Sequence, residues 1–271
     1  MLPQIQANLE AGLSVLGSGQ TPAFNDGFGC GASERCIETV WASAHLGRGE
    51  RVLDIGFTMS SLDYMGVLLE ARRSLGVTLE AVDIIQPSAV EGRYPDTWRE
   101  DIFSVPVTIG DLRSIDLPEA AYDAVTCVST IEHIGFDAPA KDGQRGAFDR
   151  PETEAEAPID RDPEATRAVM AQFAKALKHG GRAIISTPMG KGGPATVQDS
   201  LGLIARQWEY EARTWAEIAE APAFELIEQR FFRRRDDTCW SEVASPSDLA
   251  DRSSHLQPHA HGCALAVLRR A

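Results

Sequence analysis

The sequence lacks the patterns that would place it in several common classes of protein. Its 271 residues contain only five cysteines, Cys30, Cys36, Cys127, Cys239 and Cys263, and no two of them form a Cys-x-x-Cys pair. An odd number of cysteines without such a pair favours neither a disulfide framework nor a zinc knuckle. We therefore expect reduced thiols.

Long apolar runs and positive charge are also scarce. No apolar run approaches the roughly 20 residues of a membrane-spanning helix, and no basic-then-apolar signal pattern opens the chain. Lys and Arg number 26 against 40 Asp and Glu, which gives a formal net charge of -14. A surface of this sign repels phosphate backbones. We expect a cytoplasmic protein with no membrane or nucleic-acid partner.

The chain does contain two short apolar runs that each include an acidic residue near the end. Residues 51–56 include Asp54 and finish at Gly56, and residues 79–84 include Asp83 and finish at Ile84. The distance between the runs leaves room for a helix, so they predict two parallel strands of an open α/β sheet. Ligands bind at the carboxyl ends of such strands. A carboxylate such as that of Asp83 suits two adjacent hydroxyls of a ribose.

The rest of the chain predicts further strands separated by helical segments. We expect a helical and loop cap over residues 1–48, followed by the main domain over residues 49–271. The expected strands cover 51–56, 77–85, 105–109, 122–128, 182–187, 224–232 and 262–268. Asp111 and Leu112 follow the third predicted strand, and Ser129 and Thr130 follow the fourth.

This order of motifs resembles the class I S-adenosylmethionine-dependent methyltransferases of small molecules, which carry a Glu-His pair after the fourth strand, here Glu132 and His133. The resemblance covers residues 49–190 well and the C-terminus more loosely. It implies a Rossmann-like sheet of seven strands, mostly parallel with an antiparallel last strand, and helices on both faces. It also implies S-adenosylmethionine as the cofactor.

The resemblance assigns roles to residues at the sheet edge. Asp54, Gly56 and Phe57 match the first motif, which contacts the amino acid part of the cofactor, and Ser129 and Thr130 match the backbone below its methionine portion. Those matching the ribose and adenine contacts are Asp83, Ile84, Asp111 and Leu112. The family usually has Gly-x-Gly-x-Gly, whereas this chain has Thr58 and Ser60 in place of the second and third glycines.

Three residues after the fourth strand are candidates for catalysis. His133 can titrate near neutral pH and is the first candidate for a general base, with Glu132 and Asp137 behind it. A structural or cofactor-positioning role for the Glu-His pair is the alternative. The segment 137–164 that follows carries nine acidic and four basic residues. It predicts either a substrate lid that favours a cationic acceptor or a merely solvated insertion.

His255, His259 and His261 lie close together in the sequence. No carboxylate supports their H-x-x-x-H-x-H spacing, so we predict no metal site.

The expected function is methyl transfer from S-adenosylmethionine to an amine or hydroxyl of a small molecule, with an aminated sugar or a sugar-containing natural product favoured. The sequence does not decide the oligomeric state, and a homo-oligomer is one possibility. One alternative is a catalytically silent cofactor-binding scaffold or partner subunit, suggested by the missing glycines. A nucleotide-dependent oxidoreductase is disfavoured because the phosphate-binding G-x-G-x-x-G pattern is absent.

Overall fold

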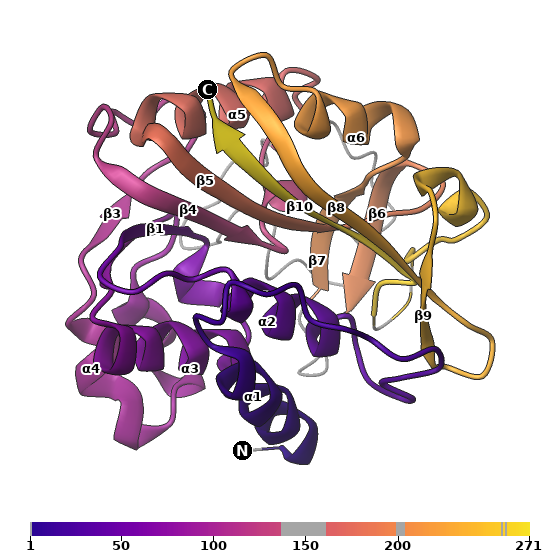
Figure 1. Cartoon of the computed structure of the whole chain (residues 1–271), viewed down its shortest axis with the longest axis horizontal. Coiled ribbons are helices and arrows are strands. Elements are labelled where there is room, and N and C mark those ends of the chain that lie inside the picture. Colours follow the sequence, from indigo (N-terminus) through magenta and orange to yellow (C-terminus); the bar gives the residue numbers. More distant parts are fainter. Residues whose placement is uncertain (1, 137–160, 199–203, 256, 258) are drawn as a thin grey trace.

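The computed structural model describes residues 2–136, 161–198, 204–255, 257 and 259–271. Within these residues a large sheet forms the centre of the molecule (Figure 1). In chain order its strands are β1 (Arg51–Ile55), β2 (Thr78–Asp83), β3 (Val107–Ile109), β4 (Tyr122–Val128), β5 (Leu177–Pro188), β8 (Phe224–Arg234), β9 (Trp240–Val243) and β10 (Gly262–Arg270). They lie side by side in the order β3-β2-β1-β4-β5-β10-β8-β9.

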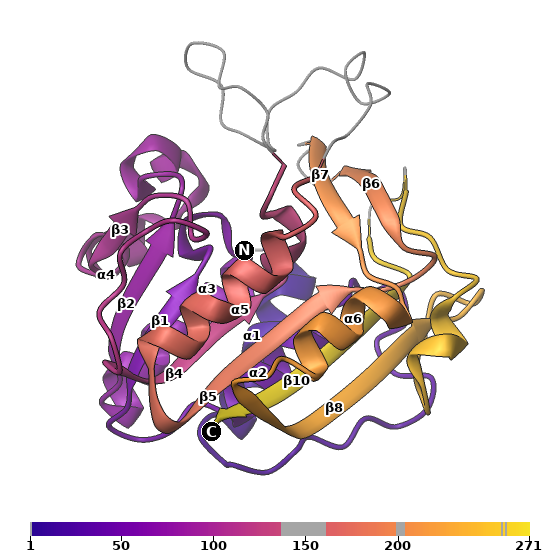
Figure 2. The ribbon, with the colours of Figure 1, turned by 90° about the horizontal axis from the view of Figure 1, so that it is seen from above.

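Strand direction divides this sheet into two parts. The run from β3 to β5 is parallel, whereas β10 is antiparallel to both of its neighbours, β5 and β8. The edge strand β9 is antiparallel to β8. A separate hairpin of β6 (Gly193–Gln198) and β7 (Ile204–Glu209) follows β5. In Figure 2 this hairpin lies beyond the carboxyl end of β5.

Helices cover both faces of the sheet (Figure 2). One face carries α1 (Pro3–Val15), α2 (Arg35–Ala44) and α3 (Leu62–Glu70), with the short α4 (Arg99–Phe103) beside them, and the other carries α5 (Ala165–Ala176) and α6 (Ala212–Ala219). In α2 the apolar side chains of Ile37, Trp41 and Ala44 recur at helical spacing and are completely buried. Each face therefore has its own apolar core, as expected for a doubly covered sheet.

The predicted mostly parallel sheet with an antiparallel last strand and helices on both faces is confirmed, with one strand more than the seven expected. The additional strand is β9, and the β6–β7 hairpin is also new. Both are short and lie in stretches rich in Gly, Ser and Pro, which weaken a strand pattern in sequence. The division into a cap over 1–48 and a domain over 49–271 stays a prediction.

The expectation that all cysteines are reduced is wrong. Cys30 and Cys239 form a disulfide across 209 residues of chain, and the three remaining cysteines are free. The two sulfurs meet because the segment before α2 runs beside the sheet edge: Phe28 pairs with Trp240 at the start of β9, and Phe24 stacks on Phe28. Sequence spacing cannot reveal such a long-range pairing.

In the part of the chain that the structure describes, every helix is too short or too polar to cross a bilayer.

Candidate active site

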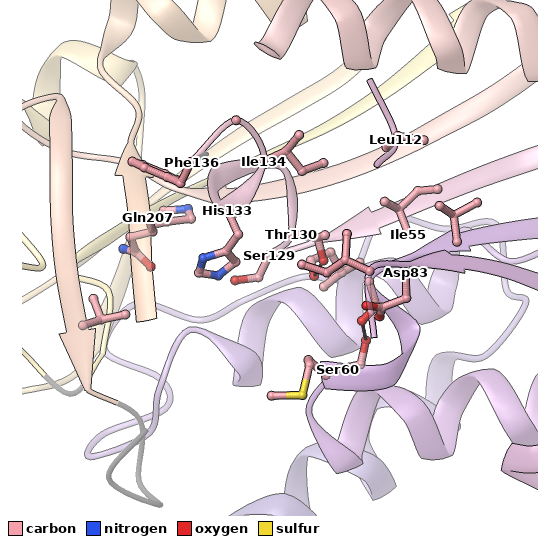
Figure 3. A pocket seen from close by; sticks show the side chains of 18 of the residues that line it. Ile55, Ser60, Asp83, Leu112, Ser129, Thr130, His133, Ile134, Phe136 and Gln207 are labelled. Atoms are coloured by element: carbon pink, nitrogen blue, oxygen red, sulfur yellow. Dashed lines mark hydrogen bonds between the residues drawn. The ribbon is translucent and has the colours of Figure 1, made fainter. Parts of the chain in front are cut away.

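A cavity of about 290 Å³ opens at the carboxyl ends of the parallel strands. It is lined by the last residues of several strands, Ile55 of β1, Asp83 of β2, Val128 of β4 and Pro188 of β5. Figure 3 shows Ile55 and Asp83 on one side of this space and His133 and Gln207 on the other. The sheet edge singled out from the sequence is therefore the wall of a cavity.

The turn after β1 brings the backbone of Gly56 into this wall. Gly56 has a φ of +88°, and a Cβ added there would lie 2.4 Å from Oγ1 of Thr130. Only glycine meets both conditions, because other residues strain at this φ and clash at this distance. The first motif is thus held in one conformation by the loop after β4.

The two hydroxyl residues that replace glycines are used within the turn. Thr58 is fully buried and donates from Oγ1 to the carbonyl oxygen of Ile85 at 2.8 Å. Ser60 lines the cavity and donates from Oγ to the carbonyl oxygen of Gly56 at 3.1 Å. These bonds tie the turn to the end of β2 and to itself, so Thr58 and Ser60 stabilise the turn.

Asp83 lines the cavity and is only 7% exposed. Its carboxylate accepts the backbone N–H groups of Thr58 at 2.8 Å and Ile85 at 3.0 Å. Burial raises the pKa of Asp83 against the effect of these bonds. A carboxylate has about four lone-pair positions, so it retains acceptor capacity for a ligand hydroxyl.

Two predicted site residues, Asp54 and Phe57, lie behind the wall and not in it. Both are completely buried and do not line the cavity. The carboxylate of Asp54 accepts hydrogen bonds from Thr126 Oγ1 at 2.7 Å and from Tyr64 Oη at 3.1 Å. Burial raises its pKa to about 7. Asp54 thus holds β1, β4 and α3 together, and its side chain is not placed to touch a ligand.

The loop after β3 closes the side of the cavity next to β2. Leu112 and Ile84 both line it, so an apolar surface is present where adenine is expected. Asp111 also lines the cavity, but its carboxylate is held by Arg113, whose Nη2 lies 2.6 Å from Oδ2. Arg113 lowers the pKa of Asp111 and also contacts Asp162 at 2.9 Å. Asp111 is therefore an ionised acceptor already shared with one cation.

The loop after β4 supplies Ser129, Thr130 and His133 to the cavity, whereas Glu132 is fully buried behind it. Ser129 has a φ of +48°, and its hydroxyl donates to Glu132 Oε1 at 2.7 Å. In Figure 3 the imidazole of His133 lies between Ser129 and Gln207. Of the three candidate catalytic residues, His133 lies in the cavity, Glu132 does not, and Asp137 lies outside the described residues.

Further cavity residues were not recognised in the sequence. Glu34 and Arg35, at the start of α2, face the space together with Phe136, Gln207 and His259. The one sequence signal that could have pointed to them is the glycine-rich stretch before α2, with Gly27, Gly29 and Gly31, because such a segment can lie over a ligand. No sequence signal pointed to Gln207, because a single glutamine in a strand that was not predicted has no distinguishing pattern.

The three clustered histidines have separate environments. His255 accepts the backbone N–H of Thr196 through Nδ1 at 3.2 Å, His259 lines the cavity, and the carbonyl oxygen of His261 accepts the N–H of Arg234 at 2.9 Å. Burial lowers the pKa of both His259 and His261. His259 is thus a second imidazole in the cavity, favoured in its neutral form.

The residues present fit a nucleoside. Gly56 presents backbone to the cavity, Asp83 offers acceptor oxygens to a diol, and Leu112 offers an apolar surface to a ring. These three contributions come from the turn after β1, the end of β2 and the loop after β3, in the order that the resemblance implies.

Comparison with known proteins gives structural likenesses only. No protein-family model matches the chain, and no curated protein matches it in sequence. Among solved structures, the (4+2)-cyclase SpnF is 16% identical with a TM-score of 0.50, covering 98% of this chain and 92% of its own.

Two methyltransferases of known structure are also similar. The 1,6-didemethyltoxoflavin-N1-methyltransferase of Burkholderia thailandensis, solved with S-adenosylhomocysteine, is 16% identical with a TM-score of 0.43, covering 84% of this chain and 74% of its own. The CcbJ methyltransferase of Streptomyces caelestis is 16% identical with a TM-score of 0.47, covering 84% and 86%. The order and directions of the strands define a Rossmann-like α/β fold, which this chain shares with SpnF.

Proposed function

We propose that the cavity binds S-adenosylmethionine and that the protein transfers its methyl group to an amine or hydroxyl of a small molecule. One observation carries this proposal: a single cavity joins Gly56, Asp83, Leu112 and Thr130, which follow or end successive parallel strands. That arrangement matches the order of contacts along the cofactor from its amino acid part to its adenine.

The chain's own residues divide the binding task. The backbone at Gly56 and the turn at Ser129 and Thr130 would hold the amino acid part, Asp83 would accept from the ribose hydroxyls, and Leu112 would cover the adenine. The cofactor supplies an activated methyl group on a sulfonium. The protein then has to align an acceptor atom with that methyl group and keep water out.

His133 is the residue that we propose as the general base. It lines the cavity with its side chain 17% exposed, beside the turn assigned to the methionine portion and facing Gln207 (Figure 3). An imidazole can take a proton from an acceptor amine or hydroxyl near neutral pH. His259 is the second imidazole of the wall and offers the matched comparison.

The acceptor that we favour carries a positive charge, as an aminated sugar does. The support is the net charge of -14, because a strongly negative protein raises the local concentration of cations. The cavity wall itself is balanced, with Glu34, Asp83 and Asp111 against Arg35, Arg93 and Arg113.

Turnover with labelled S-adenosylmethionine and a panel of amines, amino sugars and neutral sugars tests the activity. We expect His133→Gln to lower kcat by about 100-fold or more, as loss of a general base does, and His259→Gln to change it less. Equal loss in both variants would contradict the role of His133.

A scaffold without methyl transfer is the second candidate. It has a specific support, because SpnF, with a TM-score of 0.50 to this chain, is described as a (4+2)-cyclase. The same fold therefore hosts chemistry other than methyl transfer. S-adenosylhomocysteine binding without turnover on any acceptor of the panel would favour this candidate.

A further inference from the structure

A chain of hydrogen bonds runs behind the cavity wall through two buried carboxyl groups. Glu38 on α2 and Glu132 in the short 3-10 helix after β4 (Ile131–His133) are both 0% exposed and do not line the cavity. Each contacts a residue that does line it: Glu38 contacts Arg35, and Glu132 contacts Ser129. Ser186 on β5 connects the two halves.

Glu38 accepts a hydrogen bond on each of its oxygens. Arg35 Nη1 lies 2.8 Å from Oε2, and Ser186 Oγ lies 2.8 Å from Oε1. The Ser186 hydroxyl itself accepts the backbone N–H of Ser129 at 3.1 Å, so its own proton points toward Glu38. A carboxyl with donors on both oxygens and a guanidinium in contact is the arrangement of an ionised carboxylate.

Glu132 has a different set of neighbours. Its Oε1 accepts the Ser129 hydroxyl at 2.7 Å, but its Oε2 lies 3.4 Å from Thr187 Oγ1, beyond the usual limit of about 3.0 Å for a hydroxyl donor. His133 Nε2 is 3.9 Å from Oε1. The guanidinium of Arg35 contacts Glu38 and acts on Glu132 only from a distance, and the remaining donor to Glu132 is its own backbone N–H. A second buried carboxylate would be poorly compensated here, which favours a proton on Glu132.

We propose that these two carboxyls are positioning residues with unequal protonation: Glu38 is the ionised partner of Arg35, and Glu132 is a neutral acid that fixes Ser129. The inference deepens the proposed function and rests on it for the link to ligand binding. Together the two residues hold the guanidinium and the turn after β4 against the cavity.

Ser129 shows why such support is needed. Its φ of +48° is a left-handed backbone conformation that residues with a side chain seldom adopt. Bonds from its N–H to Ser186 and from its hydroxyl to Glu132 keep it there. Loss of either support frees the turn to relax, and the backbone assigned to the methionine portion relaxes with it.

Burial raises the pKa of both Glu38 and Glu132 to about 7, and Arg35 acts against burial at Glu38. Because the two values are alike, the division between an ionised and a neutral carboxyl rests on the hydrogen bonds of each group. The charged and titratable groups around Glu132 are Glu34, Arg35, Glu38, Cys127, His133 and Tyr210.

Infrared spectroscopy of the full chain tests the protonation directly. At pH 6 Asp54 also holds a proton, so we expect Glu132→Gln to remove one of two protonated-carboxyl bands and Glu38→Gln to retain both. Removal of a band by Glu38→Gln alone, or the absence of a Glu132-dependent band, overturns the assignment. This readout needs no ligand, so it decides the protonation even if the proposed cofactor does not bind.

Calorimetric titration with S-adenosylhomocysteine tests positioning. Glutamine reproduces a neutral acid in shape and polarity, so the affinity of Glu132→Gln should stay within about threefold of the wild type. Glu132→Leu removes the acceptor of the Ser129 hydroxyl and should lose about tenfold or more in affinity. Glu38→Gln should also lose about tenfold, since its amide presents N–H to a donor. Ser186→Ala repeats the test without altering a carboxyl and should lose affinity too.

The control is Glu228→Gln, which changes a hydrogen-bonded carboxylate of β8 that does not line the cavity, and should leave the affinity unchanged. Equal affinity in Glu132→Leu and the wild type would overturn positioning by Glu132. Failure of the wild type to bind S-adenosylhomocysteine would count against the proposed function and leave the infrared result standing.

Discussion

Asp54 illustrates how a motif residue can serve the fold behind a cavity and not the cavity itself. Its carboxylate is buried with donors only on Oδ2, and burial raises its pKa to about 7. The unfolded chain releases this proton near pH 4. The folded state therefore holds a proton that the unfolded state has lost between about pH 4 and pH 7, and the stability from this group falls as pH rises through that window.

Asp54→Asn removes this dependence. We expect the free energy of unfolding of the variant, relative to the wild type, to rise between pH 5 and pH 8, by about 1.4 kcal/mol for each pH unit between 5 and the folded pKa of about 7. Urea unfolding of both proteins at the two pH values measures it. The same difference at both pH values would show that Asp54 is ionised throughout.

Gly56 carries the steric requirement of the first motif. Gly56→Ala should destabilise the chain and abolish binding of S-adenosylhomocysteine, because the new Cβ would meet Thr130 at 2.4 Å. Gly19→Ala is the matched control: its φ of +65° is similarly left-handed, but no atom lies within 4 Å of the added Cβ. Thermal unfolding measures the loss of stability and calorimetry the loss of binding. Because both variants strain the backbone and only Gly56→Ala meets another residue, the difference between them is the effect of the clash. Equal losses in both variants would contradict a specific requirement at Gly56.

At the scale of elements, the N-terminal segment is fastened to the sheet by a carboxylate of β8. Glu228 accepts from Trp41 Nε1 at 3.0 Å and from Thr21 Oγ1 at 2.7 Å, and His45 Nε2 lies 3.4 Å away. Burial opposes ionisation, but these contacts outweigh it and lower the pKa of Glu228 to about 2. Its contribution is present above about pH 4 and is lost as pH falls toward 2.

Glu228→Gln should therefore cost about 1–3 kcal/mol of unfolding free energy at pH 7 and less at pH 3. Chemical denaturation at the two pH values measures this. Glu242→Gln, which disturbs the more exposed pair with Arg230, is the control and should cost less than about 1 kcal/mol. A larger loss of unfolding free energy in Glu228→Gln at pH 3 than at pH 7 would contradict the lowered pKa of Glu228.

The disulfide fastens the same segment at Cys30, between Thr21 and Trp41. Titration of free thiols in the denatured, unreduced protein should count the three free cysteines, Cys36, Cys127 and Cys263, and a dithiol reductant should lower the unfolding free energy by about 2–5 kcal/mol. A count of five thiols, with no effect of the reductant, would show that Cys30 and Cys239 are not bonded.

These elements show what the sequence could and could not predict. The turns at Gly56 and Asp83 were predictable because a strand and the residues that follow it are contiguous. The contribution of Arg35 from α2, the pairing of Cys30 with Cys239 and the placement of Gln207 on β7 were not, because each depends on segments far apart in the chain. The burial of Asp54 and Glu132 also depends on neighbours from other strands. A motif alone therefore could not show which residues line the cavity and which lie buried behind it.

For the whole molecule, the central claim is that one edge of a mixed sheet holds S-adenosylmethionine. The fold is established, but the same fold is compatible with other chemistry, as the likeness to SpnF shows. Binding preference therefore has to be measured on the protein itself.

The most direct measurement is thermal unfolding of the purified chain with S-adenosylmethionine, S-adenosylhomocysteine, NAD or no ligand. A ligand at about 100 times its dissociation constant stabilises the folded state by about 2.7 kcal/mol, which raises the melting temperature measurably. The account predicts a rise with both S-adenosyl compounds and none with NAD. A rise with NAD alone, or no rise with either S-adenosyl compound, would contradict it.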